Sequence, residues 1–321
     1  MCGIAGIIHR NGSSPIGDEM TSMLQAMKHR GPDSTGFALY GAPTEEWVMR
    51  VKLADANTPR DFDFDERLAR NRAEVQRRLR AMGARFDGIE ELNPTTFDVR
   101  VAYDADDLKA LVDQVEDVSR DAEVLSLGHS LEIVKDAGGA AEVDARHHIS
   151  RFRGTHGLGH VRLATESITA VAYGHPFWAE PFPDVSIVHN GQLTNYYTLR
   201  RLLEHDGFRF QTGNDSELIA VYLADKMSRG QTFYEALKDS VYELDGCFAY
   251  LLSMPDVIGS AKDMFAIKSI VVANVGGDTA MATEEQAIRA VYTDELDDTQ
   301  HPDPRSVFVW ERSGRVLQEI V

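Results

Sequence analysis

The 321-residue chain has little cysteine: Cys2 and Cys247 are its whole thiol content. This excludes the disulfide framework of a small secreted domain, and we expect a reducing cytoplasm as its compartment. No run of about 18 apolar residues occurs, which excludes a membrane-spanning helix of ordinary length. The N-terminus has no basic segment ahead of its apolar run, so we expect no signal peptide.

Positive charge is also scarce. The chain has 33 Lys and Arg against 51 Asp and Glu, which gives a net charge of −18. Nucleic acids and anionic membranes select for basic patches, so neither is expected as a main partner. A small anionic substrate is not excluded, because one well-placed arginine is enough to bind it. With 43% hydrophobic residues, the chain has enough apolar side chains to bury a core, and disorder is not expected.

Apolar periodicity and turn signals divide the chain into two expected domains, in keeping with its length. Near the N-terminus, residues 4–8 and 35–40 are expected to form strands around a helix at 18–28, with Asp18 as its N-cap. From residue 157 onward, strands and glycine-punctuated loops dominate. There we expect helices at 195–205, 216–228 and 233–244, and strands at 247–253, 264–272 and 307–310.

The segment 44–155 has a different character, with more charged residues and few glycines before Gly138 and Gly139. We expect strands at 47–53, 85–91, 96–103 and 123–135, and helices at 65–82 and 106–118. The order strand-helix-strand-strand-helix-strand is that of a ferredoxin-like module. The expected fold class is therefore α+β, and this order of elements assigns no activity by itself.

Cys2 is the candidate nucleophile. Removal of Met1 would place a thiol and a free α-amino group on the same residue. The amine titrates near ~8, so part of it is neutral at pH 7 and can take the thiol proton. The resulting thiolate is the attacking species. A cysteine at position 2 is a weak signal alone, and the motifs that follow along the chain carry the argument.

Seven short motifs in one order resemble those of the class II glutamine amidotransferases. They are CGIAG (2–6), RGPDSTG (30–36), GHVRLAT (159–165), HPF (175–177), HNGQLTN (189–195), NDSE (214–217) and LDGCFA (244–249). The resemblance implies an N-terminal-nucleophile hydrolase fold, an αββα sandwich of two stacked antiparallel sheets. It places the amidotransferase domain at 2–43 and 156–321, with 44–155 as an inserted α+β module.

The resemblance also implies an oxyanion hole made by the Asn190 amide and the Gly191 backbone N–H, beside the Cys2 nucleophile. Glycine permits the close approach of the main chain that such a site needs. An alternative interpretation is a tight hairpin, because Asn-Gly is a strong two-residue turn signal. Both interpretations can hold together, since a tight turn presents these donors rigidly.

The substrate glutamine would be held at both charged ends. Arg162 would grip its carboxylate with two parallel hydrogen bonds, with a hydroxyl from Thr165, and Asp215 would pair with its α-ammonium. The alternatives are a surface ion pair for Arg162, a strand-end role for Thr165 and helix N-capping for Asp215. Arg30 and Gly31 would shape the loop near the thiol, or simply end a helix.

Other reactive side chains are expected to be structural. His160, His175 and His189 fit no compact zinc-ligand spacing, so no metal site is expected. Glu217 belongs to the first turn of a helix, where the dipole favours an acid. Cys247 lies in an apolar strand and is expected to be a small buried side chain.

The chemistry needs no cofactor, and the ammonia that it releases needs an acceptor. No P-loop or dinucleotide fingerprint is present, and about 30 residues follow residue 290. We therefore expect an amidotransferase subunit that serves a separate synthase subunit, of the glutamate-synthase-like or N-methylglutamate-synthase type. In the stretch KDMFAIKSI (262–270), Ala266 and Ser269 replace the glycine and proline of the family pattern. The alternatives are a non-catalytic glutamine sensor and an N-terminal-nucleophile hydrolase of another amide.

Overall fold

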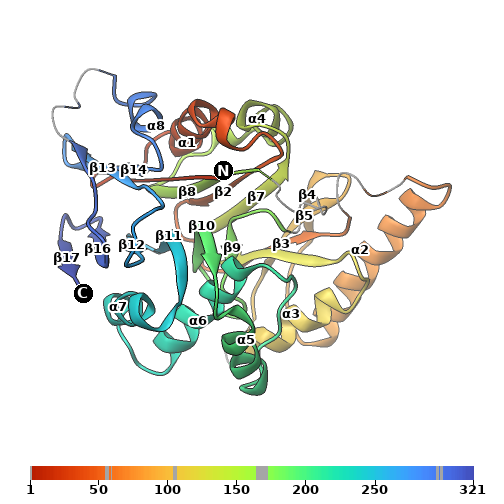
Figure 1. The fold of residues 1–321 in the computed structure, drawn as a ribbon. Helices are drawn as coiled ribbons and strands as arrows, with labels where there is room; N and C mark the ends of the chain where they lie inside the picture. Colours follow the sequence, from red (N-terminus) through yellow and green to blue (C-terminus); the bar gives the residue numbers. More distant parts are fainter. Residues whose placement is uncertain are drawn as a thin grey trace.

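The computed structural model describes residues 2–54, 58, 60–103, 107–163, 173–293, 296 and 299–321. Two stacked antiparallel sheets form its centre (Figure 1). The first is seven-stranded and has the spatial order β15 (Thr299–Gln300), β13 (Val271–Val275), β14 (Asp278–Ala282), β1 (Gly3–Ile8), β8 (His156–Arg162), β2 (Ser34–Tyr40) and β7 (Leu131–Ala137). The second is six-stranded, in the order β17 (Val316–Ile320), β16 (Ser306–Glu311), β12 (Val257–Lys262), β11 (Gly246–Met254), β10 (Ser186–Leu193) and β9 (Phe177–Trp178).

Helices cover the outer faces of both sheets, which completes the four expected layers. The seven-stranded sheet carries α1 (Ile16–Ala26), α4 (Ala140–His147) and α8 (Glu285–Arg289), with the short 3₁₀ helices η1 (Lys28–Arg30) and η3 (Ile149–Arg151) nearby. The six-stranded sheet carries α6 (Asp215–Ser228) and α7 (Phe233–Glu243), and α5 (Tyr196–His205) packs against α6. The expected sandwich of two antiparallel sheets between helices is therefore confirmed.

Apolar side chains between the sheets hold the sandwich together. Ile4 of β1, Val188 of β10 and Leu251 of β11 are fully buried in one cluster. Each such side chain contributes about 1.5–3 kcal/mol relative to an exposed position. Because β1 pairs with β8 on one side and β14 on the other, the chain directly after Cys2 lies in the middle of this core.

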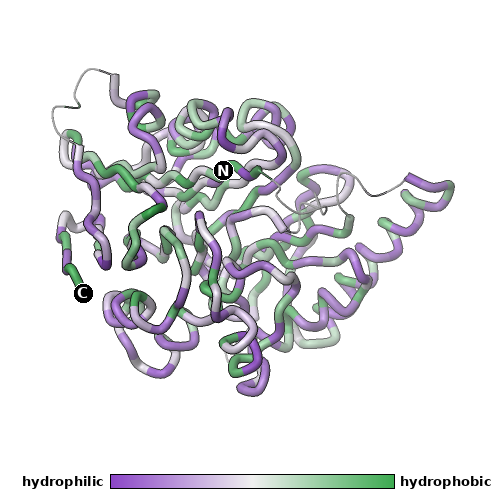
Figure 2. Tube along the Cα trace, viewed as in Figure 1, coloured by the Kyte–Doolittle hydropathy of each residue, from purple (hydrophilic) through white to green (hydrophobic). Residues whose placement is uncertain are grey.

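The inserted segment forms a sheet of its own, as expected. Its elements are β3 (Trp47–Lys52), α2 (Phe64–Ala81), β4 (Ile89–Asn93), β5 (Thr96–Val101), α3 (Leu108–Glu116) and β6 (Glu123–Gly128). The antiparallel order β4-β5-β3-β6 is the ferredoxin-like one. Most of α2 is hydrophilic (Figure 2), and four of its residues are buried against the module: Phe64, Leu68, Val75 and Leu79.

The C-terminal part of the 44–155 range lies elsewhere. The segment expected as one extended run at 123–135 breaks after β6, and β7 then pairs with β2 along seven register positions, from Ser34 to Tyr40. Helix α4 packs against α1. Apolar alternation shows which face of a strand is buried, but not which sheet it joins. We therefore propose that the inserted module ends near residue 130 rather than at 155.

Two further expectations near the chain ends are wrong. The N-cap of α1 is Pro15, so Asp18 lies inside its first turn. The segment 264–272, expected to be a strand, instead forms a turn that is followed by β13. The side chain of Asp263 stabilises this turn. Its Oδ1 accepts hydrogen bonds from the N–H groups of Phe265 (2.6 Å) and Ala266 (3.1 Å). Such a side-chain acceptor competes with a strand ladder for the same donors.

The backbone of this turn gives a stability prediction. Ala266 has a φ of +52°, in the left-handed region where a side chain costs about 1–2 kcal/mol. Glycine pays no such cost but loses more chain entropy, so Ala266→Gly is expected to raise the free energy of unfolding by about 0.5–1 kcal/mol. Urea denaturation of the purified variant measures this.

Ala141→Gly is the matched control, since Ala141 is an exposed residue inside α4. There the same change is expected to lower stability by about 1 kcal/mol. Equal losses at both positions would mean that Ala266 does not occupy the left-handed conformation in solution.

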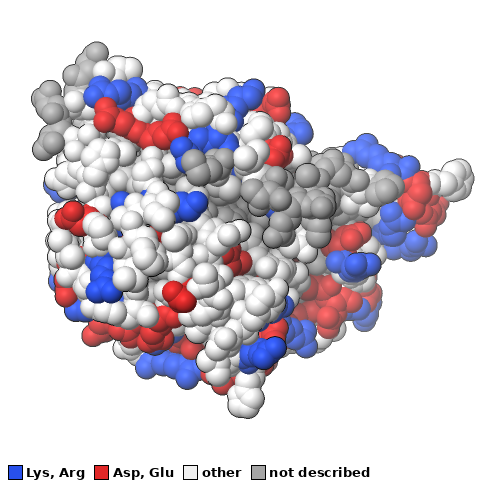
Figure 3. All heavy atoms as spheres, in the orientation of Figure 1, with Lys and Arg blue, Asp and Glu red and all other residues white. Residues whose placement is uncertain are grey.

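The surface and the helices agree with the composition. On the face shown in Figure 3, Lys and Arg are interspersed with Asp and Glu rather than gathered into one patch. Among the described residues, no helix is both long enough and apolar enough to cross a bilayer.

Candidate functional site

A cavity of about 500 Å³ lies where the end of β8, the end of β10 and the start of α6 meet. Cys2, Arg162, Gly191 and Asp215 all line it. Four residues from four separate motifs are thus brought to one cavity. Thr165 lies outside the described residues.

Cys2 stands at the entrance to β1, with its main chain held from two sides. Its carbonyl oxygen accepts hydrogen bonds from Arg30 Nε (3.0 Å) and Asn190 Nδ2 (3.2 Å). The next strand residue is held as well, since the Ile4 N–H donates to Thr283 Oγ1 at 2.9 Å. The thiol is partly exposed and lines the cavity, with its Sγ 4.0 Å from the Leu163 carbonyl oxygen. The reactive group is therefore presented from a fixed backbone.

Arg30 and Gly31 support the site from outside the cavity lining. Arg30 ties the Cys2 carbonyl to Glu284 through an Nη1–Oε1 contact of 2.5 Å. At Gly31, a Cβ would come within 2.5 Å of the Arg162 carbonyl carbon. Glycine is therefore needed there for the loop after η1 to pack against the Arg162 main chain. Arg30 thus holds the backbone that presents the thiol, and Gly31 lets the chain approach the backbone that presents the guanidinium.

Asn190 and Gly191 lie inside β10 and not in a hairpin turn, so the turn interpretation is wrong. They pair with Ala249 and Phe248 of β11. Gly191 has a φ of +153°, and a Cβ there would lie 2.2 Å from the Cys247 carbonyl oxygen. Only glycine fits this approach of the two strands. The pair stands next to Cys2, as the Asn190 contact with its carbonyl shows.

Asp215 is available to the cavity because its neighbour caps the helix. The Asn214 side chain accepts the Ser216 N–H at 2.9 Å and is the N-cap of α6. Asp215 Oδ2 accepts the Leu193 N–H at 2.9 Å, and its Oδ1 lies 3.6 Å from His189 Nδ1. Burial pushes the pKa of Asp215 up, but the His189 ring and the Leu193 N–H favour its charged form and leave the pKa below its ordinary value. A carboxylate is thus held where a substrate ammonium could bind.

Glu217 organises the loop ahead of α6. It is 7% exposed, and its two oxygens accept the N–H groups of Gln211 (2.6 Å) and Thr212 (2.8 Å). Burial raises the pKa of Glu217 above its usual value, and these hydrogen bonds oppose that shift. The expected place of Glu217 in the first helical turn is confirmed.

Three buried histidines also line the cavity. The His160 and His175 ring centroids are 4.0 Å apart, and His189 Nδ1 lies 2.8 Å from Ser216 Oγ. Burial, with the nearby His189 and Arg162 charges, lowers the pKa of His160 to about 3, so its ring is uncharged at neutral pH. In the described part of the chain, no group of three His, Cys, Asp or Glu side chains is arranged to hold a metal ion.

Sequence reasoning missed several groups at the cavity. Tyr196 and Tyr197 also line it, and Tyr197 is 75% exposed. Their only sequence signal is their position directly after the HNGQLTN motif. Cys247 is partly exposed rather than buried, because it belongs to the end of β11 that pairs beside Gly191. The Asn214 cap was also missed, since Asp215 is an equally good capping residue by type.

Comparison with known proteins gives one consistent description. Residues 160–290 match the family model of the glutamine amidotransferase domain. The chain is 34% identical to a putative glutamine amidotransferase of Methanothermobacter thermautotrophicus, over 97% of this chain and 100% of that protein. It is 31% identical to the glutamine amidotransferase-like protein GlxB of Rhizobium meliloti, over 97% of this chain and 98% of that protein.

A solved structure shares the fold. The glutamine phosphoribosylpyrophosphate amidotransferase of B. subtilis, complexed with ADP and GMP, superposes with a TM-score of 0.62 at 18% sequence identity. The match covers 99% of this chain and 49% of that one, so the chain spans about half the length of this structural relative. At this identity the likeness concerns the fold alone.

Proposed function

Since this chain belongs to the glutamine amidotransferase family, we propose that it hydrolyses L-glutamine to L-glutamate and ammonia through a thioester on Cys2. The observation that carries the proposal is the single cavity lined by Cys2, Arg162, Gly191 and Asp215. It offers a nucleophile, a cation and an anion to one small zwitterion. A substrate without both an α-carboxylate and an α-ammonium would leave Arg162 or Asp215 without a role in binding.

Binding uses the two charges of the free amino acid. The planar guanidinium of Arg162 makes two parallel hydrogen bonds to the α-carboxylate, which a lysine cannot reproduce. The carboxylate of Asp215 pairs with the α-ammonium. Thr165 is proposed to add a hydroxyl to the carboxylate end. With both ends fixed, the side-chain amide is directed at the thiol, and this positioning lowers the barrier by several kcal/mol.

The chemistry proceeds in two halves. After Met1 is removed, the α-amine of Cys2 takes the thiol proton, and the thiolate attacks the carbonyl carbon of the glutamine side chain. A C–S bond forms, and the carbonyl oxygen becomes an oxyanion bound by Asn190 and the Gly191 N–H. The C–N bond then breaks, and ammonia leaves with the proton from the α-ammonium. Water hydrolyses the glutamyl thioester, which releases glutamate and restores the thiol.

The Asn190 amide can serve two acceptors in this scheme. An amide nitrogen carries two N–H donors. One of them meets the Cys2 carbonyl oxygen at 3.2 Å, and the other is proposed to reach the oxyanion. Arg30 and Gly31 keep the Cys2 and Arg162 backbones in place during the reaction.

We further propose that the ammonia passes to a separate synthase subunit, of the glutamate-synthase-like or N-methylglutamate-synthase type, in the cytoplasm. In support, two relatives matched over nearly their full length are named for the amidotransferase alone. Co-purification from the native host tests this. The partner should raise glutamine turnover or consume the ammonia, and recovery of the chain without any partner would contradict the proposal.

Arg162→Lys tests the substrate assignment. Lysine keeps the charge but loses one of the paired hydrogen bonds, each worth about 1.5–3 kcal/mol to a charged group, so the KM for glutamine is expected to rise about 10- to 100-fold. The thermal midpoint should change little. Glutamate release at varied glutamine concentration measures the KM.

Arg289→Lys is the matched control, because Arg289 makes only a surface contact of 2.7 Å with Glu285 among its described ion pairs. It should leave the KM unchanged. An unchanged KM in Arg162→Lys as well would remove Arg162 from the carboxylate role. Glutamine binding without any turnover of wild-type protein would identify a sensor, and turnover of a different amide would identify another kind of hydrolase.

A further inference from the structure

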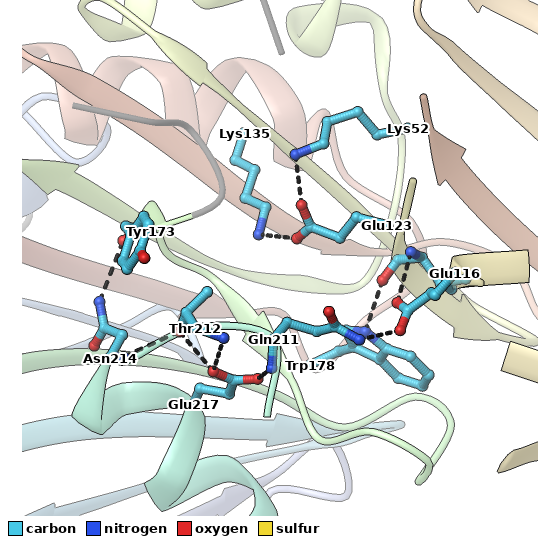
Figure 4. Close-up of polar contacts among 11 residues, drawn as sticks. Lys52, Glu116, Glu123, Lys135, Tyr173, Trp178, Gln211, Thr212, Asn214 and Glu217 are labelled. Atoms are coloured by element: carbon cyan, nitrogen blue, oxygen red, sulfur yellow. Dashed lines mark hydrogen bonds and ion pairs between the residues drawn. The ribbon is translucent and has the colours of Figure 1, made fainter. Parts of the chain in front are cut away.

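The inserted module touches the amidotransferase body beside the loop that leads into α6. Arg209 of this loop, at residues 208–214, pairs with Asp113 of α3 at 3.3 Å. Two residues further on, the Gln211 side-chain amide donates a hydrogen bond to Glu116 Oε2 at the end of α3 (Figure 4). The loop is thus held from the module through two side chains.

Glu116 is itself fixed within the module. Its Oε1 accepts the Val124 N–H of β6 at 3.0 Å. The Val124 carbonyl in turn accepts the indole N–H of Trp178, which belongs to β9 of the body, at 2.9 Å. Nearby, Glu123 bridges Lys52 of the module and Lys135 of β7, at 2.5 and 2.8 Å. Hydrogen bonds and ion pairs therefore hold the module against the body at this junction, and the Glu116 side chain is fixed by them.

From Gln211 the contacts continue to the cavity. Glu217 holds the Gln211 and Thr212 N–H groups, and Thr212 Oγ1 accepts the Asn214 N–H at 3.0 Å. Asn214 caps α6 and donates from its side chain to the Tyr173 carbonyl at 3.2 Å. Figure 4 shows this series of contacts between Tyr173 and Glu116. Asn214 and Asp215 both line the cavity.

We propose that Glu116 of the inserted module is a positioning residue for glutamine: it holds Gln211, and so sets the loop that leads into α6, whose first residue is the proposed ammonium ligand Asp215. This inference rests on the proposed function and adds to it a role for the module. The module then tunes substrate affinity without touching substrate. A change at α3, such as a partner bound to it, would be felt at the cavity.

The surroundings of Glu116 suit such a contact. Burial, followed by the negative charge of Glu180, raises the pKa of Glu116 above its usual range. Burial, followed by the charge of Asp113, raises the pKa of Glu180 as well. Nearby carboxyl groups disfavour each other's charged form, and a neutral donor such as the Gln211 amide binds Glu116 without adding a further charge. An acidic residue in its place would be repelled by the neighbouring carboxylates.

The effect is expected to be moderate because the loop is also held from the body, by Glu217 and by Arg200. Arg200 of α5 donates to the Thr212 carbonyl at 2.7 Å. Loss of the Glu116 contact therefore loosens the loop without releasing it. We expect Glu116→Ala and Gln211→Ala each to raise the KM for glutamine about three- to tenfold, the effect of one hydrogen bond, with kcat within about twofold.

A double-mutant cycle on the full-length protein tests the inference, with glutamate release and thermal midpoint measured for each variant. If the two residues act through one contact, the double variant should have the same KM as either single variant. Glu116→Gln, which keeps a hydrogen-bonding group, should return the KM to within about twofold of wild type. Glu91→Ala is the control, because its partner Arg72, at 2.6 Å, lies within the module, and it should not alter the KM.

If the KM increases of the two single variants multiply in the double variant, the inference is overturned. An equal rise of the KM in Glu91→Ala would also overturn it. If Glu116→Ala does not fold, the test uses two variants of the exposed residue Gln211. Gln211→Ala should raise the KM as above. Gln211→Glu places an acid beside Glu116 and should raise the KM further. A wild-type protein that releases no glutamate would defeat the proposed function instead. In that case the dissociation constants for glutamine can be measured by calorimetry for the same set of variants, and they still test whether Glu116 positions the loop.

Discussion

Replacing Cys2 by alanine is expected to reduce glutamate release to background while glutamine still binds within about tenfold of its wild-type affinity. The substitution removes the sulfur atom and nothing that holds the main chain. The Cys2 carbonyl remains an acceptor for Arg30 and Asn190, and Arg162 and Asp215 still line the cavity. Attack on the amide carbon has no substitute nucleophile in the proposed scheme. A coupled glutamate assay and calorimetry give the two quantities.

Cys247→Ala is the natural control, because Cys247 is the second and last cysteine of the chain. It should retain turnover, since its main chain rather than its thiol approaches Gly191. Mass spectrometry of active wild-type protein should show that Met1 has been removed. Substantial turnover by Cys2→Ala, or full activity with Met1 retained, would rule out the thioester mechanism.

Asn190→Ala is expected to lower kcat about 10²- to 10³-fold, with a much smaller change in the KM for glutamine. The loss is that of one donor to the oxyanion, which forms only after substrate has bound. Because Asn190 is 4% exposed and also holds the Cys2 carbonyl, some loss of stability should accompany the change. The Gly191 N–H remains, so residual activity is expected to exceed that of Cys2→Ala. Steady-state kinetics at saturating glutamine separates the two parameters.

Asn274→Ala provides the comparison for this variant. Asn274 is an exposed residue of β13 that accepts a hydrogen bond from Thr279 at 2.8 Å. Its loss should leave kcat near the wild-type value. If Asn190→Ala changed the KM as strongly as kcat, the residue would be a ground-state contact and not part of the oxyanion hole.

The sequence predicted the meeting of distant groups better than the local structure around them. Cys2, Arg162, Gly191 and Asp215 were chosen from separate motifs, and all of them line one cavity. In the proposed function, their residue types serve to bind a free amino acid and to attack its side-chain amide. Such residues can be recognised at single positions in the sequence, even where the secondary structure between them is not predicted correctly.

Local conformation was harder to predict where two physical explanations fit the same residues. Asn190 and Gly191 have the composition of a tight turn, yet pairing with Ala249 and Phe248 keeps them in a strand. The reason is the neighbouring strand: a side chain at position 191 would meet the Cys247 carbonyl, a contact that no periodicity reveals. Tertiary approach, and not turn propensity, requires this glycine.

Sheet membership could not be predicted for a similar reason. The sequence predicts one extended run at 123–135, and nothing in it shows that the run breaks in two or that its second part pairs with β2. The choice is made by contacts with residues far along the chain. Asp184, for example, accepts the N–H groups of His129, Ser130 and Leu131 at 2.8–2.9 Å and fixes the return into the large sheet.

The inserted module leaves the seven-stranded sheet after β2 and rejoins it at β7, and its two ends lie side by side. Tyr40 and Leu131 face each other as register partners, and the Gly41 N–H donates to the Ser130 carbonyl at 2.9 Å. A segment whose two ends adjoin in this way can change in length or sequence without disturbing the pairing of β2 with β7. If the proposals for the cavity and for Glu116 hold, exchanging the module for a different one would change how much glutamine is needed for turnover and leave the reacting groups in place.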